Sequence, residues 1–228
     1  MGARFVWLSY PLNEGTPAYG GGKGLVIKSV RSIAKGDSSN TSVWHLPSHL
    51  GTHVDVPKHF FQAGNSVDVY DAAFWIFKQV SIVGVKPEVK PLLIEPEYVI
   101  PFVCGEPDII LIKTGIGQYR EREIYWEANP GLSPDLGTEL RARFSSLRAV
   151  GIDFISISSW QDRSAGKEAH RAFLDPATPG KPIILIEDMD LSALNSNTQV
   201  QKIVALPLRV ENGDGAPCSV IAEVVHDD

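Results

Sequence analysis

Residues 148–157 form a nearly continuous apolar run, Arg148-Ala149-Val150-Gly151-Ile152-Asp153-Phe154-Ile155-Ser156-Ile157. Runs of this kind are typical of strands that are buried on both faces, as the strands of a parallel sheet are. Just before it, residues 133–146 begin with a capping serine, Ser133, and a first-turn proline, Pro134, and continue with apolar residues at helical spacing. The two segments together predict a helix that packs on a sheet, and therefore an α/β fold.

Other strands are expected on both sides of this run. Apolar segments rich in β-branched residues occur at residues 5–8, 24–30, 80–85, 108–112, 183–186, 203–210 and 219–225. Helical spacing is rarer: residues 166–174 predict a short helix, and residues 67–77 and 119–128 are weaker candidates. The 20 Gly and 16 Pro are scattered, so no linker is visible, and no segment repeats. We therefore expect one mixed α/β domain over residues 1–228.

Composition excludes several classes of partner. The formal net charge of the 228 residues is -6 and no cluster of Lys and Arg is present, which argues against nucleic-acid binding. No apolar stretch approaches the roughly 20 residues that would cross a bilayer. Cys104 and Cys218 are far apart and outside any CxxC motif, so neither a disulfide framework nor a thiolate zinc site is expected. These features, and an N-terminus without a signal-peptide pattern, predict a cytoplasmic protein that acts on a small molecule.

Histidines are concentrated in one short window. Four of the six fall within fifteen residues that also contain Asp55, namely His45, His49, His53 and His59. In an extended segment His53 and Asp55 project from the same face, so that one cation could contact both. Gly51 permits a bend that would turn His49 toward the same point. We therefore predict that His49, His53 and Asp55 bind a divalent metal and leave open positions for water.

His59 is expected to act beside this metal. Pro57 ends the extended run and fixes the direction of the chain just before His59. A neutral histidine can take a proton from an activated water and return it to a leaving amine, which is the cycle that amide hydrolysis needs. His45 has no partner at ligand spacing and is expected to be an ordinary surface residue.

Two other motifs are weak. Residues 20–24, Gly-Gly-Gly-Lys-Gly, lack the Ser or Thr and the following helix of a phosphate-binding loop. Residues 158–160, Ser-Ser-Trp, lack the flanking glycines of a nucleophile elbow. The aromatic run at residues 74–77 has two readings, core or subunit interface, of which we favour the interface.

The segment from His49 to Phe60, with the sequence HLGTHVDVPKHF, resembles the HxGTHxDxPxHF signature of the cyclase family of metal-dependent hydrolases, which includes kynurenine formamidase and isatin hydrolase. Residues 8–21 are similar to the opening strand and turn of that family, residues 108–115 to a strand that ends in Thr-Gly, and residues 149–156 to its GxDxxS strand. The resemblance implies the family's swivelling β/β/α-like fold and hydrolysis of the C-N bond of a small aryl formamide or cyclic amide.

The resemblance also implies a ligand set. It assigns one ion to His49, His53 and Asp55, and a second to Asp55, His170 and Glu187, with His59 as the acid/base. Either Zn²⁺ or Mn²⁺ suits imidazole and carboxylate ligands, and one or two ions per chain are expected. A homo-oligomer, dimer or tetramer, is also implied.

The substrate is less defined than the site. Where the formamidases carry Trp before Pro-Gly-Asp, this chain has Tyr19 followed by glycines. Tyr19 is either a substrate contact or an ordinary turn aromatic. Three alternatives stay open: a lactonase, dehydratase or cyclase that uses the same metal site, a metal-binding module without catalysis, and a cupin-like oxygenase, although the HxH pair of the last is missing.

Overall fold

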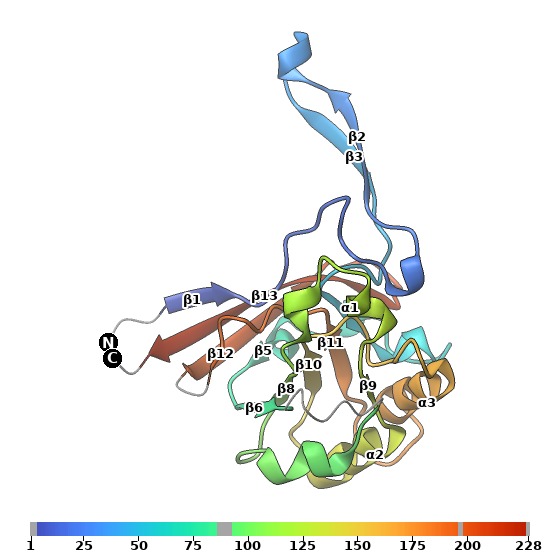
Figure 1. The fold of residues 1–228 in the computed structure, drawn as a ribbon, viewed down its shortest axis with the longest axis vertical. Coiled ribbons are helices and arrows are strands. Elements are labelled where there is room, and N and C mark those ends of the chain that lie inside the picture. The colour runs from blue at the N-terminus through green and yellow to red at the C-terminus, as the bar shows by residue number, and fades with distance from the viewer. Residues whose placement is uncertain (1–3, 86–92, 196–197, 227–228) are drawn as a thin grey trace.

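The fold was obtained as a computed structural model, and the structure describes residues 4–85, 93–195 and 198–226. Its longest strands lie in the C-terminal part of the chain (Figure 1). The strands are β1 Arg4–Trp7, β2 Val26–Arg31, β3 Thr41–His45, β4 His53–Asp55, β5 Ile76–Phe77, β6 Val80–Gly84, β7 Leu93–Ile94, β8 Ile109–Lys113, β9 Gly131–Leu132, β10 Ala149–Ile152, β11 Ile184–Glu187, β12 Thr198–Pro207 and β13 Gly215–His226. The α-helices are α1 Ile124–Glu127, α2 Pro134–Arg143 and α3 Arg163–Leu174.

One mixed sheet organises the molecule. Its strand order is β5-β12-β13-β4-β11-β10-β8-β6, and β1 pairs with β13. Strands β11, β10, β8 and β6 run parallel, whereas β4 is antiparallel to both β11 and β13. Strand β4 therefore joins the parallel part of the sheet to the long β12–β13 hairpin. The predicted α/β fold is confirmed.

The parallel strands are buried on both faces, as their apolar sequences predicted. Alternate residues such as Val150 and Ile110 contact α2 and α3 through Leu140 and Phe173. The opposite side chains, for example those of Ala149 and Leu111, pack against apolar residues of β12 and β13. The sheet thus has a helical layer on one side and its own long hairpin on the other (Figure 1).

The helix at residues 133–146 is present as α2. Its N-cap is Ser133, whose side chain accepts a hydrogen bond from the Leu136 backbone N–H, and Pro134 occupies the first turn. Helix α3 covers the prediction at residues 166–174 and begins three residues earlier, because Asp162 caps it through the Ala165 N–H.

Other expectations were wrong in part. The strand expected at residues 149–157 ends at Ile152, because residues 153–157 leave the sheet while staying buried. Residues 67–77 form two 3₁₀ turns and β5 instead of a helix, and α1 covers only four of residues 119–128. The interface proposed for residues 74–77 is wrong for Trp75 and Phe77, which are buried in the core. Within the described residues, no helix is long and apolar enough to cross a membrane.

Candidate metal centre

Strand β4 supplies the floor of the site. It lies between β11 and β13, with His53 opposite Glu187 of β11. His53 and Asp55 project from the same face, as their spacing predicted, and His53 Nε2 lies 3.4 Å from Asp55 Oδ1. Both side chains are buried, so the strand presents an imidazole and a carboxylate to the protein interior.

The bend expected at Gly51 is present. Gly51 has a φ of +68°, a left-handed conformation that favours glycine, and a Cβ there would collide with Leu12. The bend turns His49 back over β4, where its Nδ1 lies 2.7 Å from Asp55 Oδ1. Gly215 of β13 is equally constrained, because a Cβ on it would collide with the His49 ring.

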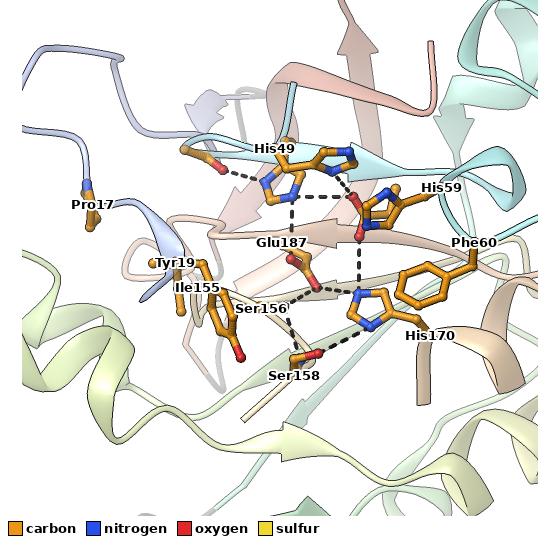
Figure 2. A pocket seen from close by; sticks show the side chains of 13 residues that line it. Pro17, Tyr19, His49, His59, Phe60, Ile155, Ser156, Ser158, His170 and Glu187 are labelled. Atoms are coloured by element: carbon orange, nitrogen blue, oxygen red, sulfur yellow. Dashed lines mark hydrogen bonds and ion pairs between the residues drawn. The ribbon is translucent and has the colours of Figure 1, made fainter. Parts of the chain in front are cut away.

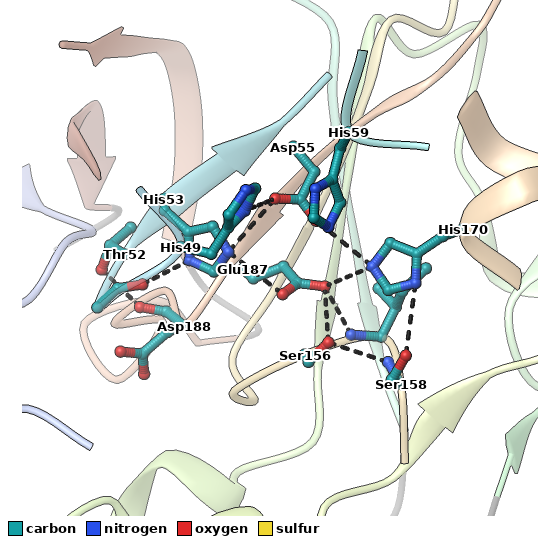
Figure 3. Close-up of polar contacts among 12 residues, drawn as sticks. His49, Thr52, His53, Asp55, His59, Ser156, Ser158, His170, Glu187 and Asp188 are labelled. Atoms are coloured by element: carbon teal, nitrogen blue, oxygen red, sulfur yellow. Dashed lines mark hydrogen bonds and ion pairs between the residues drawn. The ribbon is translucent and has the colours of Figure 1, made fainter. Parts of the chain in front are cut away.

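Two distant segments complete the site (Figure 3). His170 projects from α3 and Glu187 from the end of β11. His170 Nε2 lies 3.4 Å from Asp55 Oδ2 and 3.7 Å from Glu187 Oε1. His53 Nε2 lies 3.5 Å from the other Glu187 oxygen, Oε2. The structure therefore brings together His49, His53, Asp55, His170 and Glu187, which are 138 positions apart at the extremes.

Backbone groups orient these ligand atoms. His53 Nδ1 lies 2.8 Å from the Gly51 carbonyl oxygen, and His170 Nδ1 lies 2.8 Å from that of Gly166. A carbonyl only accepts, so each Nδ1 carries a proton, and each Nε2 faces the carboxylates, to which it donates until a metal ion displaces its proton and takes its lone pair. Glu187 Oε1 accepts from the Ile157 N–H at 2.7 Å and from the Ser156 hydroxyl at 3.2 Å.

The electrostatics of this arrangement suit a cation. Asp55 is 1% exposed and Glu187 3%, so two carboxylates share one largely buried site. Burial and the neighbouring charge of Asp55 raise the pKa of Glu187. Although burial opposes ionisation of Asp55, hydrogen bonds from His170, His49 and His53 hold its pKa well below the usual range. Two buried carboxylates with two Nε2 lone pairs match the donor set of Zn²⁺ or Mn²⁺, so the residues fit a divalent metal.

A more exposed group, made of His49, His59 and Asp214, lies beside these buried residues. Asp214, in the turn before β13, has its Oδ2 2.9 Å from His49 Nε2 and 3.1 Å from His59 Nδ1. Although burial opposes it, hydrogen bonding to Asp55 and Asp214 raises the pKa of His49 to about 9. Burial lowers the pKa of His59. The ring centroids of His49 and His59 are 4.0 Å apart.

Two sets of possible ligand atoms each lie close enough together to bind one ion. Atoms of His53, Asp55 and Glu187 lie within 4.8 Å of one another, and so do atoms of His49, Asp55 and His59. Asp55 belongs to both sets. His59, which we expected only as an acid/base, is therefore also within reach of a ligand position.

A cavity of about 240 Å³ opens above these residues (Figure 2). Its other walls are mainly apolar and aromatic, and include Pro17, Tyr19, Phe60 and Ile155. The Phe60 ring stacks on His170 with centroids 4.7 Å apart, and Tyr19 meets Trp160 edge to face. The buried Tyr19 hydroxyl has no hydrogen-bond partner among the described residues. The cavity therefore has an aromatic wall on this side.

Sequence reasoning missed Asp214. The segment Asn212-Gly213-Asp214-Gly215 reads as an ordinary hairpin turn, and nothing in its pattern indicates contact with two histidines far back in the chain. Ser156 was noticed only as part of a strand motif, and its bond to Glu187 depends on the strand ending at Ile152. His45, at the end of β3, is exposed and outside the site, as expected.

Comparisons with known proteins found a matching family model and similar relatives. The family model described as "Putative cyclase" matches residues 6–159, a range that contains His49, His53, Asp55 and His59 but ends before His170 and Glu187. "Cyclase-like protein 2" of Oryza sativa subsp. japonica is 25% identical over 230 residues, covering 96% of this chain and 79% of that protein. "Cyclase-like protein 1" of Arabidopsis thaliana is 23% identical, covering 96% and 85%.

Solved structures share the fold. Isatin hydrolase A from Labrenzia aggregata, bound to benzyl benzoate, superposes with a TM-score of 0.80 at 19% identity and covers 99% of this chain and 94% of its own. A predicted metal-dependent hydrolase from Bacillus stearothermophilus superposes with a TM-score of 0.73 at 20% identity, covering 98% and 99%. At these identities the likeness concerns the fold.

Proposed function

This chain belongs to the putative cyclase family, and we propose that it is a metal-dependent hydrolase that cleaves the C-N bond of a small aryl formamide or cyclic amide. One observation carries the proposal: the Nε2 atoms of His53 and His170 converge on the buried carboxylates of Asp55 and Glu187 at the base of a cavity. The solved relatives described as isatin hydrolase and metal-dependent hydrolase support the same chemistry.

The metal would be held mainly by the four buried residues. Asp55, His170 and Glu187 would bind one ion, and His49 and His53 would share Asp55 with a second. Zn²⁺ is our first choice and Mn²⁺ the second, and both suit imidazole and carboxylate ligands. When bound, such an ion supplies a water of lowered pKa and polarises a carbonyl.

His59 would move the proton. Its Nδ1 is engaged by Asp214, which leaves Nε2 to accept a proton from the attacking water and to give it to the departing nitrogen. In the balanced reaction the hydroxyl of water joins the acyl carbon, its hydrogen joins nitrogen, and the C-N bond breaks. Asp214 would orient the ring throughout, as the partner of a general base usually does.

The cavity would select the substrate by size and surface. A volume of about 240 Å³ suits a small molecule and excludes a polymer. Phe60 and Tyr19 would contact an aromatic ring, and the free Tyr19 hydroxyl would bond one polar group of the substrate.

A screen with and without metal tests this function. Protein stripped with a chelator and reloaded with Zn²⁺ or Mn²⁺ is offered a simple aryl formamide, N-formylkynurenine, isatin and a small lactone. Mass spectrometry should detect formate and the free amine from a formamide, or the ring-opened product of isatin that is one water heavier, only in the reloaded protein. Turnover of the lactone alone would replace the amidase with a lactonase, and metal binding without any turnover would indicate a binding module.

A further inference from the structure

A charged pair, Arg120 and Asp188, lies buried next to the metal centre. Asp188 follows Glu187 at the end of β11 and is 1% exposed, and the Arg120 side chain is 12% exposed. The Asp188 carboxylate accepts from Arg120 Nη2 at 2.6 Å and from Arg120 Nε at 2.9 Å, so the guanidinium binds both of its oxygens. The Tyr125 hydroxyl donates to the same carboxylate at 2.5 Å. Burying two charges is costly, and the reaction proposed above uses neither of them, so the pair indicates another role.

The backbone of Asp188 is fixed as firmly as its side chain. Its φ of +51° lies in the left-handed region, which is costly for a residue with a Cβ and persists only where the surroundings hold it. The Asp188 carbonyl accepts from the Thr52 hydroxyl at 2.5 Å (Figure 3), and its N–H donates to the Phe154 carbonyl at 2.9 Å. Thr52 precedes His53, and Asp188 follows Glu187. Asp188 is therefore a rigid point between two strands that carry proposed metal ligands.

The two side chains that bind the Asp188 carboxylate come from one segment, residues 116–127, here called the wall segment. It consists of the 3₁₀ turn η8 (Ile116–Tyr119), a short connection and α1. Arg120 lies in the connection and Tyr125 in α1. The neighbouring Arg122 is exposed and lies over the Tyr119 ring instead, 5.6 Å from its centroid. Arg120, rather than Arg122, therefore attaches the wall segment to the strand that ends in the metal site.

The wall segment in turn holds the loop of residues 10–21 at both of its ends. At the first end, the Arg120 guanidinium lies over the Tyr10 ring, 4.1 Å from its centroid. At the second end, α1 contacts the 3₁₀ turn η1 (Tyr19–Gly21). The wall segment therefore connects this loop to the buried charged pair.

Two indoles lie at the second end, where the loop forms a wall of the cavity. Pro17 and Tyr19 of the loop line the cavity (Figure 2). Trp126 of α1 meets Trp160 edge to face with centroids 5.3 Å apart, and Trp160 meets the Tyr19 ring in the same way at 5.4 Å. A Cβ on Gly20 would collide with the Trp160 ring, so the turn lies directly against that indole. A displacement of the wall segment would therefore move Tyr19 with it.

We propose that Arg120 and Tyr125 are positioning residues that, by binding Asp188, fix the Tyr19 wall of the cavity relative to the metal ligands. The ring of the substrate would lie between this wall and the metal, so the charged pair limits the size of ring that fits. The inference rests on the proposed function, because a bound substrate reports the position of the wall through its affinity. The position of the wall itself can be measured without a substrate.

Circular dichroism measures the wall directly. Two indoles in edge-to-face contact give a coupled band in the far ultraviolet, and loss of that band in Trp126→Phe assigns it to Trp126 and Trp160. Arg120→Met/Asp188→Asn removes both charges, and asparagine tolerates the left-handed backbone, so this variant should stay folded but lose most of the band. Arg122→Met, in the same segment, is the matched control and should keep the band. A full band in the folded double variant would overturn the proposal.

Arg120→Lys is a milder second variant. Lysine keeps the charge opposite Asp188 but cannot form two parallel hydrogen bonds, so this protein should fold and lose part of the band. If it keeps the whole band and the KM of wild type, Arg120 acts only as a counter-charge and the positioning role is wrong.

Steady-state kinetics on a simple aryl formamide test the consequence for the substrate. Arg120→Met/Asp188→Asn should raise KM about tenfold, with kcat and zinc affinity within about threefold of wild type. In a Tyr19→Ala background the same two changes should have little effect on KM, because the wall no longer contacts the substrate. Additive effects on KM, or a zinc affinity that falls as far as the substrate affinity, would contradict a positioning role. If no amide is turned over, the proposed function fails, and circular dichroism still decides whether the charged pair fixes the wall.

Discussion

The site has two halves that differ in burial and in scaffold. The inner half consists of His53, Asp55, His170 and Glu187, which are at most 4% exposed and project from strands β4 and β11 and helix α3. The outer half consists of His49, His59 and Asp214, whose side chains are 24%, 27% and 43% exposed and which stand on turns and loops. Both halves meet at Asp55.

This difference indicates that metal binding and proton transfer belong to different parts of the site. In the inner half, backbone groups fix each imidazole and Glu187, so the ligand atoms are already oriented. In the outer half, His59 is held by one half-exposed carboxylate, Asp214, and so its hydrogen bond can be exchanged at low cost, whereas His49 bonds to both Asp214 and Asp55. We assign metal binding chiefly to the inner half and proton transfer to the outer half.

The largest effect is expected from Glu187→Gln. Loss of an inner ligand should lower metal affinity by more than about 100-fold, above the effect of changing a residue that only hydrogen-bonds to a ligand. The metal-free variant should unfold at the same or a higher temperature than metal-free wild type, because one of two facing buried carboxylates is now neutral. Calorimetric metal titration and thermal unfolding in chelator measure both, with Glu106→Gln as control. Undiminished affinity would remove Glu187 from the ligand set.

The next substitution, His59→Ala, tests whether the two halves of the site have different roles. Loss of a general acid/base should lower kcat by about 10²–10⁴-fold while the inner half keeps its metal. Turnover of a formamide and metal content by plasma mass spectrometry are measured on the same sample. Full turnover would sink the proposed mechanism, and loss of metal together with activity would make His59 a ligand.

Asp214→Asn should have a smaller effect. The variant keeps the size of the side chain but weakens its hold on His49 and His59, so kcat should fall about tenfold with metal content unchanged. The exposed Asp135→Asn serves as control. A kcat equal to that of wild type would mean that Asp214 does not orient the acid/base.

The smallest effect is expected from Tyr19→Phe. Removal of one neutral hydroxyl contact, worth about 1 kcal/mol, should raise KM about fivefold with little change in kcat. Steady-state kinetics on an aryl formamide measure the split. An unchanged KM would make Tyr19 an ordinary turn aromatic.

The part of the site carried by residues 49–55 was predictable because its signals are local. The spacing of His53 and Asp55 placed them on one face, and Gly51 marked the bend that returns His49. The apolar run at residues 149–157 indicated the α/β fold, since continuous apolar runs are typical of strands buried on both faces. The end of strand β10 at Ile152 could not be predicted, because residues that leave a sheet and stay buried are as apolar as those within it.

The rest depends on long-range packing. His170 and Glu187 follow from the family resemblance alone, since neither has a ligand-spaced neighbour in the sequence. Asp214 is 155 positions from His59, and only the pairing of β13 with β4 brings it there. The β2–β3 hairpin was visible only as one strand at residues 24–30, because exposure on both faces leaves no periodic pattern for β3.

Anomalous diffraction from crystals grown with Zn²⁺, recorded at the zinc absorption edge, tests the division of the site most directly. We expect the strongest peak in the inner half, about 2.0–2.2 Å from a carboxylate oxygen of Asp55 or Glu187 and from an Nε2 atom of His53 or His170. A peak confined to His49 and His59, or no peak between the two carboxylates, would contradict the assignment of metal binding to the inner half.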